Sequence, residues 1–161
     1  MTPFEKEVSD RISEVPHNKE LCDAAAAFIK ASTVPKYSYN FHWQGRPIIQ
    51  YPQDIVAMQE IIWDVKPDLI IEMGIAHGGS LIFSASMLAL LDMYESIESG
   101  AMIKAVASKR KVLAVDIDIR EHNKSAIEAH PMASRIQMIE GSSIEPEIIK
   151  QVHAIAKDYS R

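Results

Sequence analysis

Three short apolar runs mark the second part of the chain, and helical segments alternate with them. The runs begin at Leu69, Lys111 and Ile136, and they are rich in β-branched residues. Such runs are typical of parallel strands buried on both faces. The expected strands end at residues 72, 118 and 139, and the expected helices cover 53–65, 81–91, 123–129 and 146–157. This alternation predicts an α/β fold with right-handed crossovers.

The first fifty residues have a different pattern. Residues 2–15 and 19–31 place apolar side chains at helical spacing, and Asn18 is a candidate N-cap of the second helix. From 33 to 52 the periodicity is lost among prolines, a glycine and many aromatic residues. This loop either anchors itself to the domain through its aromatic side chains or forms a lid over a ligand. Residues 92–108 give no clear pattern.

A glycine turn follows the first expected strand and leads into a helix. Its pattern is E-x-G-x-x-x-G-G-S, from Glu72 to Ser80. Gly74, Gly78 and Gly79 allow positive φ angles and a close approach of the backbone to a ligand, and Ser80 can cap the helix. The arrangement indicates a cofactor site, although a strand, turn and helix without any ligand share the same pattern.

The spacing of the turn favours one class of cofactor. A dinucleotide fingerprint requires G-x-G-x-x-G, and Ala76 stands here in place of its second glycine. Glu72 places a carboxylate beside the turn, where it repels phosphate but accepts hydrogen bonds from an ammonium group. S-adenosylmethionine, with an amino-acid head, a nucleoside and no phosphate, fits better. His77, inside the turn, is a candidate base or a loop histidine that contacts cofactor or solvent.

Polar residues also end the other two expected strands. Asp116 is the better candidate for binding both hydroxyls of a ribose, because ligands of open parallel sheets lie at the carboxyl ends of the strands. Asp118 either contacts the next turn or caps the following helix. Ser142 and Ser143 follow the third strand, where they would lie beside an adenine or cap the helix 146–157.

Composition narrows the function classes. With 161 residues, 47% hydrophobic and 24% charged, the chain has the length and composition of one globular domain. Within it we distinguish a helical arm with the aromatic loop, residues 1–52, from an α/β part, residues 53–161. A net charge of −5 gives no reason to expect nucleic acid as a partner. The apolar run 81–91 contains two serines and is too short to span a bilayer, so no membrane segment is expected. A single cysteine, Cys22, expected to be packed, and an N-terminus without a signal-peptide pattern predict a cytoplasmic location.

An ordered series of motifs resembles the cephalosporin hydroxylase family. The series comprises G-R-P-I-I-Q at 45–50, Q-D-I at 53–55, K-P-D-L-I-I-E at 66–72, G-I-A-H-G-G-S at 74–80, V-D-I-D at 115–118 and E-G-S-S at 140–143. The resemblance covers roughly residues 37 to 161. It implies a Rossmann-like, class I S-adenosylmethionine-dependent methyltransferase sheet in three α/β/α layers, with the first three parallel strands present and a helical segment before them. The family includes relatives that methylate sugar hydroxyls.

The resemblance also implies a site. The residues expected around the cofactor are Glu72, Gly74, Gly78 and Ser80 at the methionine moiety, Asp116 at the ribose, and Ser142 or Ser143 near the adenine. His77 and Gly79 are also expected to bind the cofactor. Family members resemble metal-dependent methyltransferases, whose magnesium ligands come from later strands in a segment reading like D-S-x-H. Residues 1–161 contain no such segment, so we name no metal ligand and no catalytic base, and Mg²⁺ would need ligands from beyond residue 161. We expect the remaining strands of a seven-stranded sheet there; a homo-oligomer, in which a second copy completes the sheet, is the alternative.

The expected function is O-methylation of a hydroxylated small molecule such as an antibiotic or a sugar, with a place in antibiotic biosynthesis. Two alternatives stay open, namely a module that binds the cofactor without turnover, and a hydroxylase acting in antibiotic or polysaccharide biosynthesis. A nicotinamide dehydrogenase is disfavoured, because Glu72 and the shifted glycines do not suit phosphate contacts.

Overall fold

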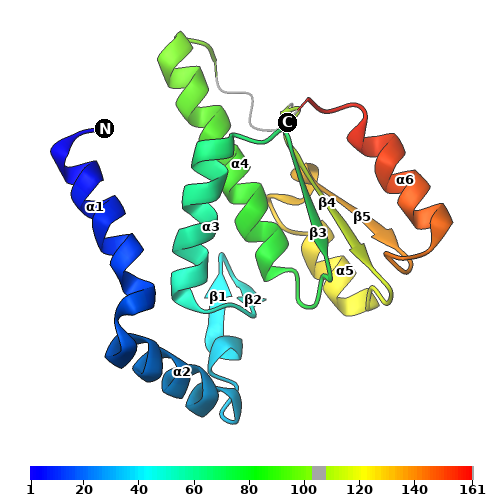
Figure 1. The fold of residues 1–161 in the computed structure, drawn as a ribbon. Coiled ribbons are helices and arrows are strands. Elements are labelled where there is room, and N and C mark those ends of the chain that lie inside the picture. Colours follow the sequence, from blue (N-terminus) through cyan, green and yellow to red (C-terminus); the bar gives the residue numbers. More distant parts are fainter. Residues whose placement is uncertain (103–107, 161) are drawn as a thin grey trace. The chain divides into compact units, whose positions relative to one another are not determined.

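The chain folds into two compact units (Figure 1). The computed structural model describes residues 1–102 and 108–160, and the units are Met1–Ser38 and Tyr39–Arg161. The sequence suggested a boundary after residue 52. The difference arises because the aromatic loop, although irregular in sequence, packs its apolar side chains into the core of the α/β unit.

The first unit consists of two helices joined by a 3-10 turn. α1 spans Pro3–Glu14, η1 spans Val15–His17 and α2 spans Lys19–Thr33. Thr2 and Glu5 form a reciprocal capping box at the start of α1, and Asn18 caps α2 by accepting a backbone hydrogen bond at 3.0 Å. Both expected helices and the Asn18 cap are confirmed. The expected packing of Cys22 is wrong: α2 buries only Ser32, and Cys22 is exposed.

The second unit is built on a parallel sheet of three strands. β3 spans Leu69–Met73, β4 spans Lys111–Asp116 and β5 spans Ile136–Glu140, in the spatial order β3-β4-β5. Ile71 pairs with Leu113, and Leu113 pairs with Gln137. The three expected strands and their parallel arrangement are confirmed, although β4 is two residues shorter than expected.

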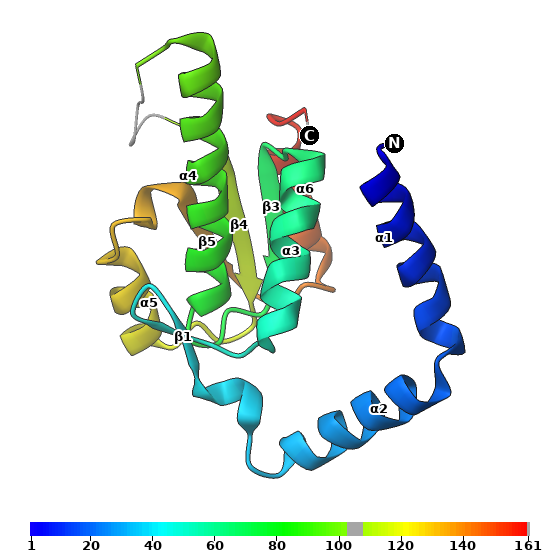
Figure 2. The same cartoon turned by 90° about the vertical axis from the view of Figure 1, so that its left-hand side faces the viewer.

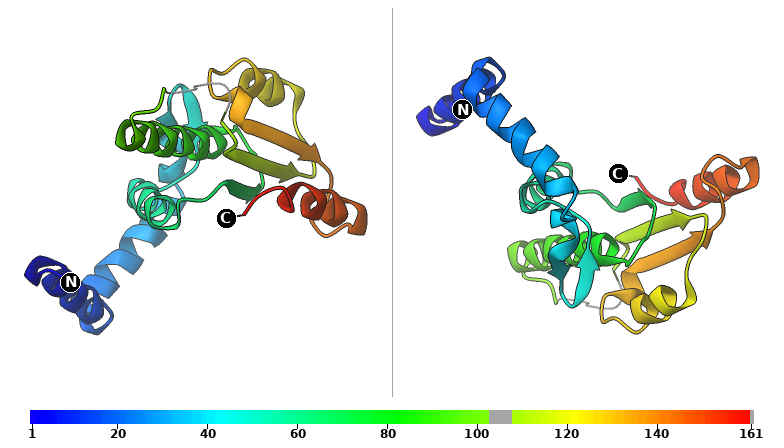
Figure 3. Two further views of the ribbon diagram at one scale, coloured as in Figure 1. Left: turned by 90° about the horizontal axis from the view of Figure 1, so that it is seen from above. Right: turned by 90° about the horizontal axis from the view of Figure 1, so that it is seen from below.

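Helices cover both faces of this sheet (Figure 3). α3 (Pro52–Val65), α4 (Gly79–Ser99) and α5 (Glu121–Glu128) lie on one side, and α6 (Pro146–Ala156) lies on the other. Alternate residues of β4 separate two apolar clusters. Val112 and Ala114 pack with α3, α4 and α5, whereas Leu113 and Val115 pack with α6. This period of two is that of a strand buried on both faces, and the three-layer α/β/α fold is confirmed.

α4 is longer than the apolar run suggested. It has 21 residues, and Gly100, which takes a left-handed conformation (φ 67°), caps its carboxyl-terminal end. The part of the ambiguous segment up to residue 99 is therefore helical, and 103–107 lie outside the described residues. By length and composition, α4 is the one described helix that could cross a membrane, but half of its apolar window is buried inside the unit, and a core helix passes the same test.

The aromatic loop contains a small hairpin that the sequence did not reveal. η2 (Tyr37–Asn40) leads into β1 (Phe41–Trp43), which pairs with antiparallel β2 (Arg46–Ile48). The connecting residues Gln44 and Gly45 have φ angles of 45° and 86°, as in a type I′ turn. Trp43 Nε1 donates to Ser86 Oγ at 2.9 Å, and the Trp43 ring meets the Phe83 ring edge-on with centroids 4.9 Å apart. These contacts support the anchoring interpretation of the loop.

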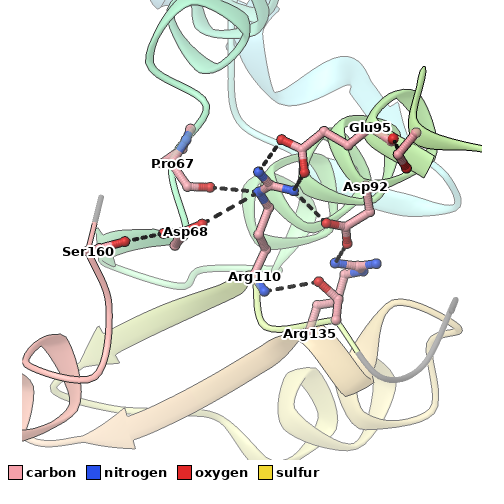
Figure 4. Close-up of polar contacts among 9 residues, drawn as sticks. Pro67, Asp68, Asp92, Glu95, Arg110, Arg135 and Ser160 are labelled. Atoms are coloured by element: carbon pink, nitrogen blue, oxygen red, sulfur yellow. Dashed lines mark hydrogen bonds and ion pairs between the residues drawn. The ribbon is translucent and has the colours of Figure 1, made fainter. Parts of the chain in front are cut away.

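A cluster of ion pairs closes the amino-terminal end of the sheet (Figure 4). Arg110, directly before β4, donates to Asp92 (2.6 Å) and Glu95 (2.6 and 3.0 Å) of α4 and to the Pro67 carbonyl (3.3 Å) before β3. The second carboxylate oxygen of Asp92 pairs with Arg135 at 2.6 Å. Arg110 and Arg135 are 9% and 4% exposed. The cluster therefore ties the starts of all three strands to α4 through charges that are largely removed from water.

This pairing lowers the pKa of two carboxyl groups. Burial tends to raise the pKa of Asp92, but hydrogen bonds from Ser108 and Arg110 and the ion pair with Arg135 outweigh burial and hold the pKa below its usual value. The hydrogen bond from Arg110 likewise lowers the pKa of Glu95. A carboxyl group whose folded-state pKa is depressed stabilises the fold above its unfolded-state pKa, and this contribution is lost as the pH falls through the folded-state value.

We expect Arg110→Met to lower the free energy of unfolding by about 3 kcal/mol at pH 7, because the substitution leaves partly buried carboxylates without their cation. The loss should shrink as the pH falls below the usual carboxyl range and through the lowered pKa values of Asp92 and Glu95 in the folded state. Urea denaturation at pH 7 and pH 3 measures both effects. Lys150→Met is the control, since it removes an exposed pair with Glu147 (3.7 Å) and should change stability by less than about 1 kcal/mol. Equal losses in the two variants would contradict this role of Arg110.

Candidate functional site

A cavity of about 370 Å³ opens beside the carboxyl end of β3. Its walls are the glycine turn, the last residues of β3, the segment 47–50, and Asp54 and Met58 of α3. Figure 2 shows α3 and α4 side by side on one face of the sheet, with the glycine turn at the foot of α4. Six of the nine site residues expected from the sequence line this cavity: Glu72, Gly74, His77, Gly78, Gly79 and Ser80.

Hydrogen bonds fix the backbone of the glycine turn. The Gly74 N–H donates to the Val115 carbonyl (2.8 Å), which extends the pairing of β3 with β4, and the Gly78 N–H donates to the Ile75 carbonyl (2.8 Å). Ile75 is buried, and its N–H donates to the Asp116 carboxylate at 2.6 Å. The turn is thus held to the end of β4 by both a carbonyl and a carboxylate.

The three glycines of the turn have different neighbours. Gly74 has a φ of 92°, and a Cβ there would meet nothing within 4 Å, so its backbone is open to a ligand. Gly78 has a φ of 80°, and a Cβ would lie 2.5 Å from the Ile127 side chain. Gly79 is the first residue of α4, where a Cβ would lie 2.2 Å from the Pro47 carbonyl oxygen. The sequence assigned all three glycines to ligand approach, whereas Gly78 and Gly79 make room for the protein's own residues.

Glu72 and Ser80 form a polar pair in the wall of the cavity. The Ser80 hydroxyl donates a short hydrogen bond to the Glu72 carboxylate. Ser80 lies inside α4, whose N-cap is Gly78, so the expected capping role of Ser80 is wrong. Burial raises the pKa of Glu72, and the hydrogen bond from Ser80 offsets only part of this rise. A desolvated carboxylate of this kind suits a ligand that carries a positive charge.

Asp116 stands at the end of β4, but its carboxylate also binds the protein backbone. One oxygen accepts from the Ile75 N–H (2.6 Å) and the other from the Asp118 N–H (3.1 Å). Burial tends to raise the pKa of Asp116, but the backbone hydrogen bonds outweigh burial and hold it below its usual value. A second cavity, of about 310 Å³, is lined by Asp116 with Ala76, His77, Asp118, Arg120 and Asn123. The ribose role of Asp116 stays a prediction, and the structure adds that this residue holds the glycine turn.

The other expected polar residues do not cap helices. The N-cap of α5 is Arg120 and not Asp118, and the N-cap of α6 is Glu145 and not Ser142 or Ser143. Both serines directly follow β5, at the same carboxyl edge as Asp116, but they do not line either cavity. Their place beside an adenine stays a prediction.

Two residues that hold the turn were not singled out from the sequence. Arg46 donates to the His77 carbonyl from Nε (3.0 Å) and from Nη2 (2.6 Å), and Asn123 Nδ2 donates to the Ala76 carbonyl (2.8 Å). Arg46 belongs to the G-R-P-I-I-Q motif, but a motif does not reveal a partner 31 residues away. Asn123 lies in a short polar helix and carries no signal of its own.

Comparison with known proteins places this site in a family. The family described as Rhamnosyl O-methyltransferase/CmcI matches residues 35–161. The chain belongs to this family. The match confirms the resemblance to the cephalosporin hydroxylase family and covers the hairpin together with the α/β unit.

Relatives of this chain include the Rhamnosyl O-methyltransferase of Mycobacterium leprae (strain TN), which is 26% identical over 117 residues. These residues are 73% of this chain and 42% of the relative, so the chain spans about two fifths of the curated relative's length. Two solved CmcI structures are also similar. One, named with "SAH", has a TM-score of 0.42 at 17% identity and covers 63% of this chain and 43% of its own. The other, an apo-structure, has a TM-score of 0.49 at 16% identity, and the match covers 76% of this chain and 43% of that chain.

We expect Gly79→Ala to destabilise the chain by about 2 kcal/mol, because the added methyl group overlaps the Pro47 carbonyl and forces the hairpin away from α4. In an unhindered helical position the same change would be stabilising by about 0.5–1 kcal/mol. Thermal and urea denaturation measure the change. Ser99→Ala, in the exposed last turn of α4, is the control and should be close to neutral. A neutral or stabilising effect of Gly79→Ala would contradict the close approach.

We expect Glu72→Gln to stabilise the ligand-free chain at pH 7 by about 0.5–1 kcal/mol, because a neutral amide avoids the desolvated charge while it still accepts from Ser80. A raised folded-state pKa means that stability is fully present below the unfolded-state pKa of about 4.3 and is lost as the pH rises through the folded-state value. Wild type and variant should therefore agree near pH 4 and diverge at higher pH in denaturation curves. Glu128→Gln, at an exposed position of α5, should show no such divergence; a divergence of equal size would refute the assignment to Glu72.

Proposed function

We propose that this chain binds S-adenosylmethionine at the glycine turn and acts in O-methylation of a hydroxylated small molecule. The observation that carries the proposal is the desolvated Glu72 carboxylate beside the open backbone of Gly74, in a cavity at the carboxyl end of a parallel sheet. Membership of the rhamnosyl O-methyltransferase/CmcI family supports the reaction class.

The cavity offers complementary groups for the amino-acid head of this cofactor. The Glu72 carboxylate would accept hydrogen bonds from the ammonium group of the ligand. The positive charge of this group would offset the cost of desolvating the carboxylate, which raises the pKa of Glu72 in the free chain. The N–H groups in the first turn of α4 lack partners within the helix, and they favour an anionic group such as the carboxylate of the ligand. The open backbone at Gly74 leaves space for the ligand beside these groups.

The second cavity would take the ribose. The Asp116 carboxylate accepts from backbone N–H groups, among them those of Ile75 and Asp118, and it also lines this cavity, so it would meet a ribose hydroxyl while it holds the turn. Asp118 lines the same cavity. Ser142 and Ser143 would lie nearest to the adenine, because they follow the next strand at the same edge.

The cofactor, when bound, supplies a methyl group on a sulfonium sulfur. The residues described here would orient this group, and alignment of the acceptor oxygen with it is the main requirement for transfer. The proposed acceptor is a sugar or antibiotic hydroxyl. In the described residues, no group of three or more His, Cys, Asp or Glu side chains is placed to hold a metal ion, so the proposal assigns no metal ligand.

We expect S-adenosylhomocysteine to bind the folded chain in isothermal titration, and Glu72→Gln to weaken this binding by about tenfold or more, because a charge-assisted hydrogen bond is lost. NADH is the ligand control and should not bind, since Glu72 repels phosphate. Glu128→Gln is the matched control for the loss of one negative charge.

Binding of NADH in place of S-adenosylhomocysteine, or a folded chain that binds neither, would contradict the proposed cofactor. Unchanged affinity of Glu72→Gln would contradict the assigned contact. A ligand that binds only the folded state also raises stability by mass action, by about 2.7 kcal/mol at a concentration of 100 times Kd, so a thermal shift gives an independent reading.

A further inference from the structure

Arg46 and Asn123 meet behind the glycine turn. Arg46 comes from β2, and Asn123 comes from α5. Arg46 Nη2 donates to Asn123 Oδ1 at 3.1 Å, and the same Nη2 and Nε donate to the His77 carbonyl. Asn123 Nδ2 donates to the Ala76 carbonyl at 2.8 Å. Two successive carbonyl groups of the turn are thus engaged by a joined pair of side chains from two other segments.

The amide of Asn123 is fixed at both ends. Asn123 is 4% exposed, its oxygen accepts from Arg46, and its nitrogen donates to the turn. A buried amide in this position is costly to leave unpaired. The link therefore favours one arrangement of the hairpin, the turn and the start of α5.

The turn needs such support because its backbone conformation is unfavourable. Ala76 has a φ of 46°, in the left-handed region that residues with a Cβ rarely adopt. The C=O and N–H groups of a trans peptide point in opposite directions. Holding the carbonyls of Ala76 and His77 therefore also sets where the N–H groups of His77 and Gly78 point, and the Gly78 N–H indeed donates to the Ile75 carbonyl.

We propose that Arg46 and Asn123 are positioning residues for the cofactor turn: together they keep Ala76 left-handed and so keep the backbone of Gly74 to Gly78 in its ligand-ready shape. The link with cofactor affinity rests on the function proposed above. The effect on the conformation of the turn does not depend on that function, because it can be measured without any ligand. Arg46 lines neither cavity and Asn123 lines only the second one, so both reach the site of the cofactor's amino-acid head through the turn.

The test compares three variants of the full 161-residue chain. Arg46→Met removes the guanidinium. Asn123→Asp keeps the shape of the side chain and an acceptor for Arg46, but it loses the N–H donor to the Ala76 carbonyl. This second variant keeps the inference testable if Arg46→Met does not fold. Trp43→Phe is the matched control, because it removes the hydrogen bond to Ser86 from the same hairpin but leaves the turn contacts intact.

Hydrogen exchange of the backbone amides in 74–80, followed by mass spectrometry without ligand, is the primary measurement. We expect exchange at least about tenfold faster in Arg46→Met and Asn123→Asp, beyond what their global stabilities explain, and unchanged local exchange in Trp43→Phe. Titration with S-adenosylhomocysteine should show a matching loss of affinity in the first two variants only.

Unchanged exchange in both turn variants would overturn the inference, and so would an equal local effect of Trp43→Phe, which would show that anchoring the hairpin is sufficient. Normal affinity in a variant whose turn has loosened would also overturn it. If the wild-type chain does not bind S-adenosylhomocysteine, the proposed function fails, whereas faster exchange in the two turn variants would still support the positioning of the turn.

Discussion

The backbone contact between Pro47 and Gly79 is the constraint on which the site depends. Because the Pro47 carbonyl oxygen lies 2.2 Å from where a Cβ at position 79 would be, the hairpin rests directly on the first residue of α4. This contact brings the segment 47–50 to the cavity as a wall. It also brings Arg46 within reach of the His77 carbonyl. A hairpin of two three-residue strands thereby becomes part of the site, with Trp43 holding its far side on Phe83.

The carboxylates of the amino-terminal ion-pair cluster and Glu72 at the carboxyl end of β3 have different partners. At the amino-terminal end, Arg110 and Arg135 are buried with carboxylate partners, and the pKa values of Asp92 and Glu95 are lowered. At the carboxyl-terminal end, burial raises the pKa of Glu72, and a serine hydroxyl is its hydrogen-bond partner. Paired charges stabilise the fold, whereas a carboxylate that is desolvated without a cation, as Glu72 is, disfavours its own charged form.

The extent of the family match agrees with the way the chain divides. The rhamnosyl O-methyltransferase/CmcI family matches from residue 35, and the compact α/β unit begins at Tyr39. The hairpin therefore belongs with the sheet in both descriptions, and the boundary between the two units falls inside η2. The helices α1 and α2 lie before the match, which is consistent with a site built entirely within the second unit.

The sequence by itself determined the three parallel strands, most helices, the parallel α/β architecture and six of the residues that line the cavity beside β3. These features follow from local patterns: β-branched runs, helical spacing, and a glycine turn with Glu72 before it. Only the tertiary structure decided how individual residues of that turn act. Gly79 leaves room for the Pro47 carbonyl, and Ser80 donates a hydrogen bond to Glu72 instead of capping α4. The Asp116 carboxylate accepts a hydrogen bond from the Ile75 N–H. The roles of Arg46 and Asn123 were likewise decided only by the tertiary structure, since their partners are 31 and 47 residues away. No local sequence pattern encodes contacts between segments that only folding brings together.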